Sequence, residues 1–290
     1  MATIAAPLLH RAALVELAGE DAGAFAHAQF ASDVAGLAPG SAQWSAWLDA
    51  QGRVRNLFAL ARIDPQRLLA WLPLGDAAGM AAALGRYVLR SRLRVRALEE
   101  HAYSTVAAGK GTPAVVVRDD GIELALPALP AWRLHFRGIP SDAGPVIDAL
   151  PSALAAAGIE AGLAWLDGGL EGGFTGAALD LGRIGATRID KGCYPGQEIV
   201  ARLHYRGGNK RHCRRLRIDG RGETPAPGTR LIRTGDAAGS DCGRILYAAP
   251  HDDGATRALA VVDEAALTGP LHLPDGREVA VLPALANAPH

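Results

Sequence analysis

The chain has 290 residues, of which 49% are hydrophobic and 21% charged, a composition typical of a globular protein with room for two or more domains. Its 30 Lys and Arg residues balance its 30 Asp and Glu residues. This balance excludes a globally basic nucleic-acid-binding protein and leaves only local basic patches as sites for a polyanion.

Cysteine usage and hydropathy indicate the compartment. The three cysteines, Cys193, Cys213 and Cys242, form an odd and sparse set without C-x-x-C spacing, which argues against a secreted disulfide framework. No apolar run approaches the length of a membrane span, and the first residues lack a charged-then-apolar signal pattern. The sequence therefore predicts a cytosolic protein that does not enter a membrane.

The first part of the chain is expected to combine strands and helices. Alternating apolar residues on both sides of the turn at 50–52 predict a β-hairpin. Asp76 is expected to cap a helix at 77–89. The other predicted elements are strands at 8–17, 43–49, 54–60 and 67–72 and a helix at 20–30.

Four arginines alternate along a strand predicted at 90–96. Arg90, Arg92, Arg94 and Arg96 would share one face of that strand. The favoured interpretation is a solvated sheet face, because arginines are common where one side of a sheet is wet. The alternative is a wall that faces an anionic ligand.

The second part begins with short β runs and ends in a β-rich region. Three β runs are expected between residues 113 and 136, then a helix at 146–157 and a glycine-rich segment at 158–176. So long an irregular segment is usually functional. Short β runs at 213–218, 229–234, 242–248, 257–263 and 277–282 predict a small barrel of five or six strands.

The richest stretch chemically runs from Asp190 to Arg217. Gly192 and Gly196 bracket a cysteine, a tyrosine and a proline, which predicts a tight turn with its backbone amides presented outward. Lys191, Gln197 and Glu198 could add side-chain contacts to a ligand held there. A helix is expected to start at 198–201, with a carboxylate in its first turn.

Residues 191–198, KGCYPGQE, resemble the K-G-C-Y-x-G-Q-E signature of the YgfZ family, folate-binding proteins related to the aminomethyltransferase of glycine cleavage, its T protein. Further blocks in the same order strengthen the resemblance. They are FASDVAGL at 30–37, LDAQGRVRNLF at 48–58, YVLRSRLRV at 87–95, GIEAGL at 158–163 and IVARLHYRGGNKR at 199–211. Residues 104–157 match the family least.

The resemblance implies an α+β fold: a multi-domain ring of two α+β (ferredoxin-like) subdomains and a C-terminal antiparallel β-barrel. The subdomains would occupy residues 1–212 and the barrel 213–290, around a central opening that binds tetrahydrofolate. The implied function is to support assembly or repair of iron–sulfur clusters in client enzymes, including enzymes that modify tRNA. Iron–sulfur client or assembly proteins would then be the partners.

One departure from the wider family bears on catalysis. Aminomethyltransferases carry an aspartate after the hairpin glycine that helps activate the folate amine, whereas Gly52 is followed here by Arg53, Val54, Arg55 and Asn56. The obvious general base is missing. A folate-binding accessory protein without catalysis is therefore favoured, and a folate-dependent aminomethyltransferase is the alternative. At 174–176 the chain also lacks the proline-containing stretch usual in YgfZ relatives.

Cys193 is the residue expected to carry thiol chemistry or a transient cluster contact. A lysine before it and a helix start after it would favour a thiolate. The plainer interpretation is a small buried apolar residue. Because Cys213 and Cys242 fall in the predicted barrel, no complete cluster or other metal site is expected within the chain, and a metal bound at Cys193 would be shared with a partner.

The remaining candidates are expected to hold the folate. They are Lys191, Gly192, Tyr194, Gly196, Gln197, Glu198, Arg202 and Arg206. Simpler roles stay open: an ion pair between Lys191 and Glu198, a core position for Tyr194 and turn geometry for the glycines. The basic rim at 202–211 would suit folate carboxylates. It would equally suit an RNA backbone, so an RNA-binding module is the second alternative.

Overall fold

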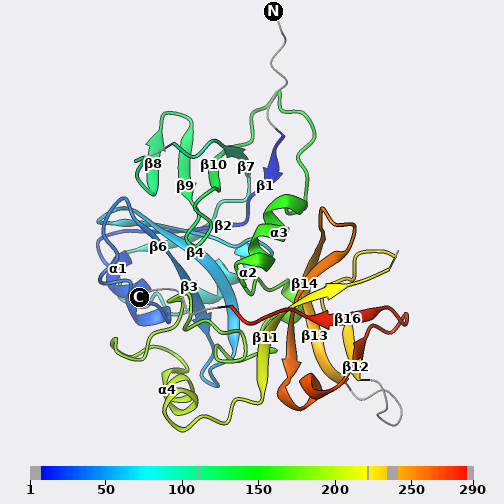
Figure 1. The fold of residues 1–290 in the computed structure, drawn as a ribbon. Helices are drawn as coiled ribbons and strands as arrows, with labels where there is room; N and C mark the ends of the chain where they lie inside the picture. Colours follow the sequence, from blue (N-terminus) through cyan, green and yellow to red (C-terminus); the bar gives the residue numbers. More distant parts are fainter. Residues whose placement is uncertain (1–7, 110, 221, 234–240, 286–290) are drawn as a thin grey trace, which may run out of the picture. The chain divides into compact units, whose positions relative to one another are not determined.

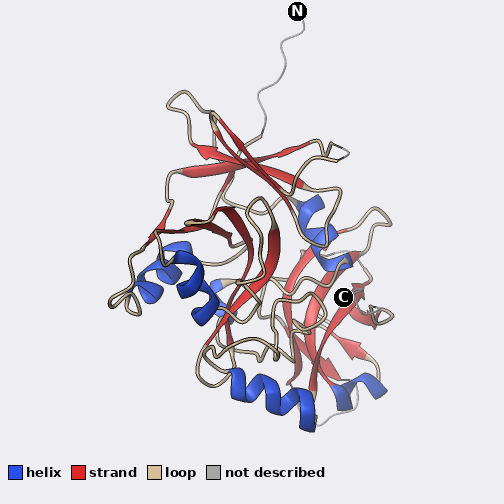
Figure 2. Ribbon diagram, turned by 90° about the vertical axis from the view of Figure 1, so that its left-hand side faces the viewer, coloured by secondary structure: helices blue, strands red, loops and turns tan. Residues whose placement is uncertain are grey.

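The computed structural model describes residues 8–109, 111–220, 222–233 and 241–285. The fold is of the mixed α and β class, as predicted, and its strands and helices are drawn in Figures 1 and 2. The chain divides into two compact units. The first comprises Met1–Ala26, Val34–Gln43 and Phe58–Pro151, and the second His27–Asp33, Trp44–Leu57 and Ser152–His290. Since these segments interleave, neither unit is one continuous stretch of sequence.

A five-stranded sheet with the order β3-β4-β5-β2-β6 contains the predicted hairpin. Its strands are β2 (Leu14–Ala18), β3 (Ala42–Leu48), β4 (Val54–Asp64), β5 (Arg67–Trp71) and β6 (Arg94–Ala97). The helices that precede β3 and β6 are α1 (Ala22–Gln29) and α2 (Ala77–Gly85). The Asp76 side chain accepts a hydrogen bond from Gly79 N at 3.0 Å, which confirms the predicted helix cap.

The first unit contains a second sheet, with the order β1-β7-β10-β9-β8. Its strands are β1 (His10–Arg11), β7 (His101–Val106), β8 (Val115–Arg118), β9 (Gly121–Ala125) and β10 (Arg133–Gly138). The three β runs predicted between 113 and 136 are thereby confirmed. All of these strands pair antiparallel.

The helix predicted at 146–157 begins later than expected. Helix α3 runs from Ser152 to Glu160, and Ile147 instead makes an isolated bridge to His10. The Ile147 amide donates to Leu9 O at 2.9 Å. Pro151 explains the later start, because the residue before a proline is pushed towards extended backbone.

The strand predicted at 90–96 is wrong over its first half. Regular pairing begins only at Arg94, so the four arginines do not share one strand face. Arg92 lies in a bend and pairs with Glu20 at 2.6 Å, while Arg96 pairs with Glu16 at 2.6 Å. The 92 and 96 side chains are 72% and 65% exposed, which agrees with the solvated interpretation.

The C-terminal region is a closed barrel of six strands in the order β11-β14-β13-β12-β15-β16, which confirms the predicted barrel. The strands are β11 (Arg211–Ile218), β12 (Arg230–Arg233), β13 (Asp241–Pro250), β14 (Thr256–Asp263), β15 (Leu271–His272) and β16 (Glu278–Val281). Prediction missed β15, which is too short to show alternation. Residue 234, the end of the run predicted at 229–234, lies outside the described residues. The 3-10 turn η2 (Glu264–Thr268) follows β14.

Helix α3 packs against β13 and β14 of the barrel. The Trp165 ring stacks on Tyr247 with centroids 5.4 Å apart, and the Tyr247 hydroxyl donates to Leu163 O at 2.7 Å. The barrel therefore shares one compact unit with the segment that precedes it. A domain boundary between 212 and 213 stays a prediction. None of the helices in the described part of the chain has the length and apolar character needed to cross a membrane.

Candidate functional site

The signature turn packs backbone to backbone against the hairpin turn of β3 and β4. Gly196 has φ +80° and precedes helix α4 (Gln197–Arg206). A Cβ atom on Gly196 would lie 2.4 Å from Asp49 O and 2.7 Å from Gly52 Cα. Gly52 also has a positive φ, and its own Cβ would lie 2.8 Å from Ile199 Cβ. Glycine is therefore required at both positions by conformation and by space.

Lys191 binds the protein's own backbone. Its ammonium donates to three carbonyl oxygens at the end of α1: His27 O at 2.5 Å, Phe30 O at 2.6 Å and Ser32 O at 3.1 Å. These three hydrogen bonds join the signature turn to the end of α1, so the lysine stabilises that helix end. Burial lowers the pKa of Lys191 to about 8. No ion pair joins it to Glu198 among the described contacts.

Two further signature residues hold the turn from within. Tyr194 is buried, and its hydroxyl donates to Arg188 O at 2.7 Å. Burial raises the pKa of Tyr194 to about 12. The Gln197 amide donates to Lys191 O at 3.0 Å. These hydrogen bonds hold the turn closed. Lys191, Tyr194 and Gln197 therefore all stabilise its backbone conformation.

Cys193 is exposed and forms no disulfide. Gly192 beside it has no positive φ, and an added Cβ would come no closer than 3.6 Å to His27 Nε2. In the described structure nothing requires glycine at 192. The turn therefore presents the thiol to solvent and leaves room around it.

Helix α4 forms one wall of a cleft of about 610 Å³. The other walls are the hairpin turn at 50–53 and the segment 173–175, and Arg202, Leu203 and Lys210 contribute side chains. Of the predicted site residues, only Arg202 lines this cleft. Glu198 and Arg206 are exposed on α4 and do not line it.

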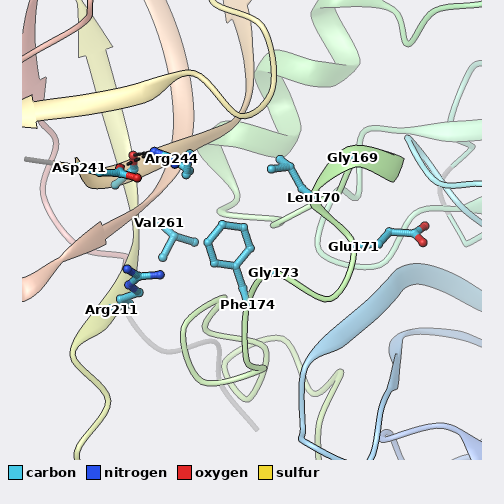
Figure 3. A pocket seen from close by; sticks show the side chains of 10 residues that line it. Gly169, Leu170, Glu171, Gly173, Phe174, Arg211, Asp241, Arg244 and Val261 are labelled. Atoms are coloured by element: carbon cyan, nitrogen blue, oxygen red, sulfur yellow. Dashed lines mark hydrogen bonds and ion pairs between the residues drawn. The ribbon is translucent and has the colours of Figure 1, made fainter.

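A second cavity, of about 220 Å³, lies next to the cleft and shares Phe174 and Arg211 with it (Figure 3). On one wall of this cavity Arg244 forms an ion pair with Asp241. The 3-10 turn η1 (Gly168–Leu170) contributes Leu170 to its wall, and the Gly169 amide of this turn donates to the Asp167 side chain. The glycine-rich segment thus forms walls of both hollows.

Sequence reasoning missed Glu171. Its carboxylate accepts a hydrogen bond from the amide of Asn56 at 2.7 Å, and Figure 3 shows it directed away from Phe174. Arg53 donates to Gly173 O at 3.1 Å and so fixes the same segment to the hairpin. A carboxylate therefore lies beside the hairpin after all, supplied by a residue more than a hundred positions away. Only the glycine-rich composition of its segment could have drawn attention to it.

The other two cysteines lie in the barrel, where they were expected. Cys213 is on β11, and burial raises the pKa of its thiol to about 12. Cys242 is buried on β13 and its thiol contacts Leu231 O at 3.1 Å. Within the residues that the structure describes, no three His, Cys, Asp or Glu side chains are grouped so as to hold a metal ion.

The sequence was compared with protein families and with curated proteins. No family model matches the chain. The tRNA-modifying protein YgfZ of Klebsiella pneumoniae (strain 342) is 28% identical over 221 residues, which cover 69% of this chain and 67% of that protein. An uncharacterized protein of Haemophilus influenzae is 28% identical over 201 residues, 68% of each chain. The YgfZ protein of Cronobacter sakazakii is 34% identical over 113 residues, 39% of this chain and 34% of its own.

Among solved structures, the glycine cleavage system aminomethyltransferase T from Bartonella henselae matches with a TM-score of 0.70. The match covers 96% of this chain and 85% of that one at 15% sequence identity, which establishes the fold alone. The resemblance drawn from residues 191–198 is thereby confirmed: the chain is a homologue of the proteins named tRNA-modifying protein YgfZ, with the fold of aminomethyltransferase T.

Proposed function

We propose that the chain is a cytosolic tetrahydrofolate-binding accessory protein that supports assembly or repair of iron–sulfur clusters in client enzymes, including enzymes that modify tRNA. One observation carries the folate part. The signature helix α4, the hairpin turn and the glycine-rich segment, three parts distant in sequence, together form the cleft of about 610 Å³. The homology to YgfZ proteins and the fold support the assignment.

The cleft residues fit a reduced folate. Its volume lies within the ~300–1,000 Å³ usual for small-molecule sites. Phe174, Ile199 and Leu203 supply apolar surface for a ring system, and Arg202 and Lys210 supply cations for the carboxylates of the tail. Bound there, tetrahydrofolate would offer a reduced pterin whose amines accept and release one-carbon units. The chain's own contribution is to bind and orient that ring and tail.

The signature turn has a separate part in the proposal. Lys191, Tyr194 and Gln197 fix its backbone, and Cys193 stays exposed on it. Because Cys193 does not line the cleft, a client or assembly protein can reach the thiol while the cleft is occupied. A transient thiolate contact to an iron–sulfur cluster, the cargo of the process, is the role we assign to Cys193.

Calorimetric titration with tetrahydrofolate tests the cleft. Arg202→Gln removes a cation that lines the cleft, so it should weaken binding about tenfold, as loss of one charge-assisted hydrogen bond does. Arg206→Gln is the matched control, because this arginine lies one turn further along α4 and outside the cleft. Absence of saturable binding to the wild type, or equal weakening by both variants, would overturn the proposed folate site.

Complementation of a deletion strain tests the cysteine. Cys193→Ser should lower the activity of an iron–sulfur tRNA-modifying enzyme in that strain while leaving tetrahydrofolate affinity unchanged. Cys213→Ser is the control, because the pKa of about 12 keeps that thiol protonated and unreactive. Full activity with Cys193→Ser would show that the exposed thiol has no part in cluster support.

A folate-dependent aminomethyltransferase is the second candidate, and Glu171 is the observation that favours it. This carboxylate beside the hairpin could take the place of the missing base. Aminomethyl transfer to tetrahydrofolate that the wild type catalyses and Glu171→Gln abolishes would establish this candidate. A wild type without turnover, assayed at saturating folate, would eliminate it.

A further inference from the structure

A third cavity, of about 210 Å³, lies within the first unit between its two sheets. It is lined by residues of β2 and β5 from one sheet and of β7 to β10 from the other. Its apolar lining includes Leu14, Ile122 and Phe136. Its charged lining consists of Arg67, Arg118 and Arg137 and one carboxylate, Asp120. This cavity contains none of the residues of the proposed folate cleft.

The three lining arginines are each paired with a carboxylate: Glu16, Glu123 and Asp120. Two arginines outside the lining share two of these carboxylates, so five guanidinium groups around the cavity face three carboxylates. Arg67 shares Glu16 with Arg96, at 2.7 and 2.6 Å. Arg118 shares Glu123 with a second arginine, at 2.9 and 3.6 Å. Glu16 and Glu123 therefore each serve two guanidinium groups, and the network of ion pairs around the cavity keeps an excess of positive charge that can attract an anion.

Two buried polar atoms at the cavity have no hydrogen-bond partner among the described residues. They are Nε of Arg137 and Nδ1 of His101, both on residues that line it. Among the contacts of the described residues, the guanidinium of Arg137 has one ion pair, with Asp120 at 3.8 Å, which is too long for a hydrogen bond. The Nε–H of Arg137 is always a donor, whereas Nδ1 of His101 donates or accepts according to the tautomer of the ring. Because buried donors are normally satisfied, Nε of Arg137 points to an acceptor that the described residues do not supply.

We propose that this cavity binds the phosphate group of a small compound. A guanidinium matches the geometry of a phosphate with two parallel N–H donors, and Arg137 has that capacity to spare. The apolar residues could pack against a small organic body attached to the phosphate. The volume is below the ~300 Å³ at which sites for larger ligands begin, so a folate does not fit it.

Titration of the purified full-length protein at low salt with two probes, inorganic phosphate and phenyl phosphate, tests the proposal. The wild type should bind saturably, and Arg137→Gln should weaken binding about tenfold or more. His101→Gln gives a second variant, on the neighbouring strand β7 of the same sheet. Arg11→Gln is the matched control in the same unit, because Arg11 does not line the cavity and contacts Asp148 only at 4.0 Å.

The two probes distinguish the source of the phosphate. Tighter binding of phenyl phosphate assigns the cavity to an organic phosphate, and equal binding assigns it to the free ion. No saturation by either probe at millimolar concentration overturns the proposal. Binding that survives Arg137→Gln and His101→Gln but is lost in Arg202→Gln also overturns it, because the phosphate would then occupy the cleft beside α4.

Discussion

At the residue scale, most residues of the signature at 191–198 fix the backbone conformation of the turn. Lys191 satisfies carbonyls at the end of α1, Gln197 closes the turn onto Lys191, and Gly196 allows the hairpin to touch it. Cys193 is exposed, and the described contacts give it no structural role; the same holds for Gly192 and Glu198, neither of which carries a thiol. The turn is thus held in one conformation by these contacts, and it exposes the thiol of Cys193 to solvent.

Lys191→Met should lower the free energy of unfolding by about 2 kcal/mol, because the three hydrogen bonds that the ammonium donates to backbone carbonyls are lost. Denaturant titration measures this loss. The sign of its pH dependence follows from the pKa of about 8 in the fold against the ordinary 10.5. Between these values the unfolded chain binds more protons, so the wild type gains stability as pH rises. The gap between wild type and variant should widen from pH 8 to 10.5. A gap that narrows would show that burial does not lower this pKa.

The two signature glycines give a matched pair. Gly196→Ala forces a side chain into a positive φ and into contact with Asp49 O, and should cost about 2 kcal/mol or more of unfolding free energy. Gly192→Ala meets nothing closer than 3.6 Å and should change stability by less than about 0.5 kcal/mol. Equal losses in chemical denaturation would mean that the contact between the two turns is not what requires glycine.

At the element scale, a buried charge joins three strands of the first unit. Glu16 lies on β2, and its side chain is 4% exposed. It accepts hydrogen bonds from Arg67 on β5 and from Arg96 on β6, at 2.7 and 2.6 Å. Burial alone would raise the pKa of Glu16, but the two arginine hydrogen bonds outweigh it and the pKa is lowered. The carboxylate therefore holds together strands that arrive from distant parts of the sequence.

Glu16→Gln should cost about 3 kcal/mol of unfolding free energy at pH 7, because it leaves two guanidinium groups without their counter-charge. Since the folded pKa is lowered, this contribution is present above the unfolded value of 4.5 and is lost as pH falls through the folded value. The wild type should lose its advantage over the variant in acid denaturation below pH 4.5. Glu20→Gln, at an exposed pair with Arg92, should cost less than about 1 kcal/mol. A comparable loss in both variants would contradict the special role of the buried carboxylate.

At the scale of the whole molecule, the units are not consecutive in sequence. The hairpin of β3 and β4 passes through both, and the barrel shares its unit with α3 and Trp165. The predicted division into residues 1–212 and 213–290 treats the barrel as independent. Because Trp165 stacks on Tyr247 of the barrel, we expect the segment before the barrel to contribute to the barrel's stability.

Two fragments test whether the barrel is stable by itself or depends on the segment before it. A fragment of residues 152–290 keeps α3 and Trp165 on the barrel, whereas one of residues 207–290 exposes Tyr247, whose ring and hydroxyl are buried against them. We expect the longer fragment to have a midpoint of thermal unfolding higher by several degrees, because burial of a large aromatic pair contributes on the order of 2 kcal/mol. Identical midpoints in circular dichroism would support the barrel as a domain on its own.

The sequence by itself determined the elements whose signals are local. The alternation around Gly52 predicted the hairpin, Asp76 predicted the start of α2, and the octapeptide at 191–198 predicted the family and the fold. Local signals failed where the chain departed from regular spacing. Pro151 delayed α3, the bend at Arg92 shortened β6, and β15 was too short to leave a pattern.

Only the tertiary structure decided what the candidate site is made of. Lys191 meets carbonyls more than 150 residues away, Asn56 meets Glu171, and α4 meets the hairpin to form the cleft. No periodicity in a sequence records which distant backbone groups lack partners or which cations share a carboxylate. These contacts are fixed by packing and by the need to satisfy buried polar groups, and such conditions exist only once the chain has folded.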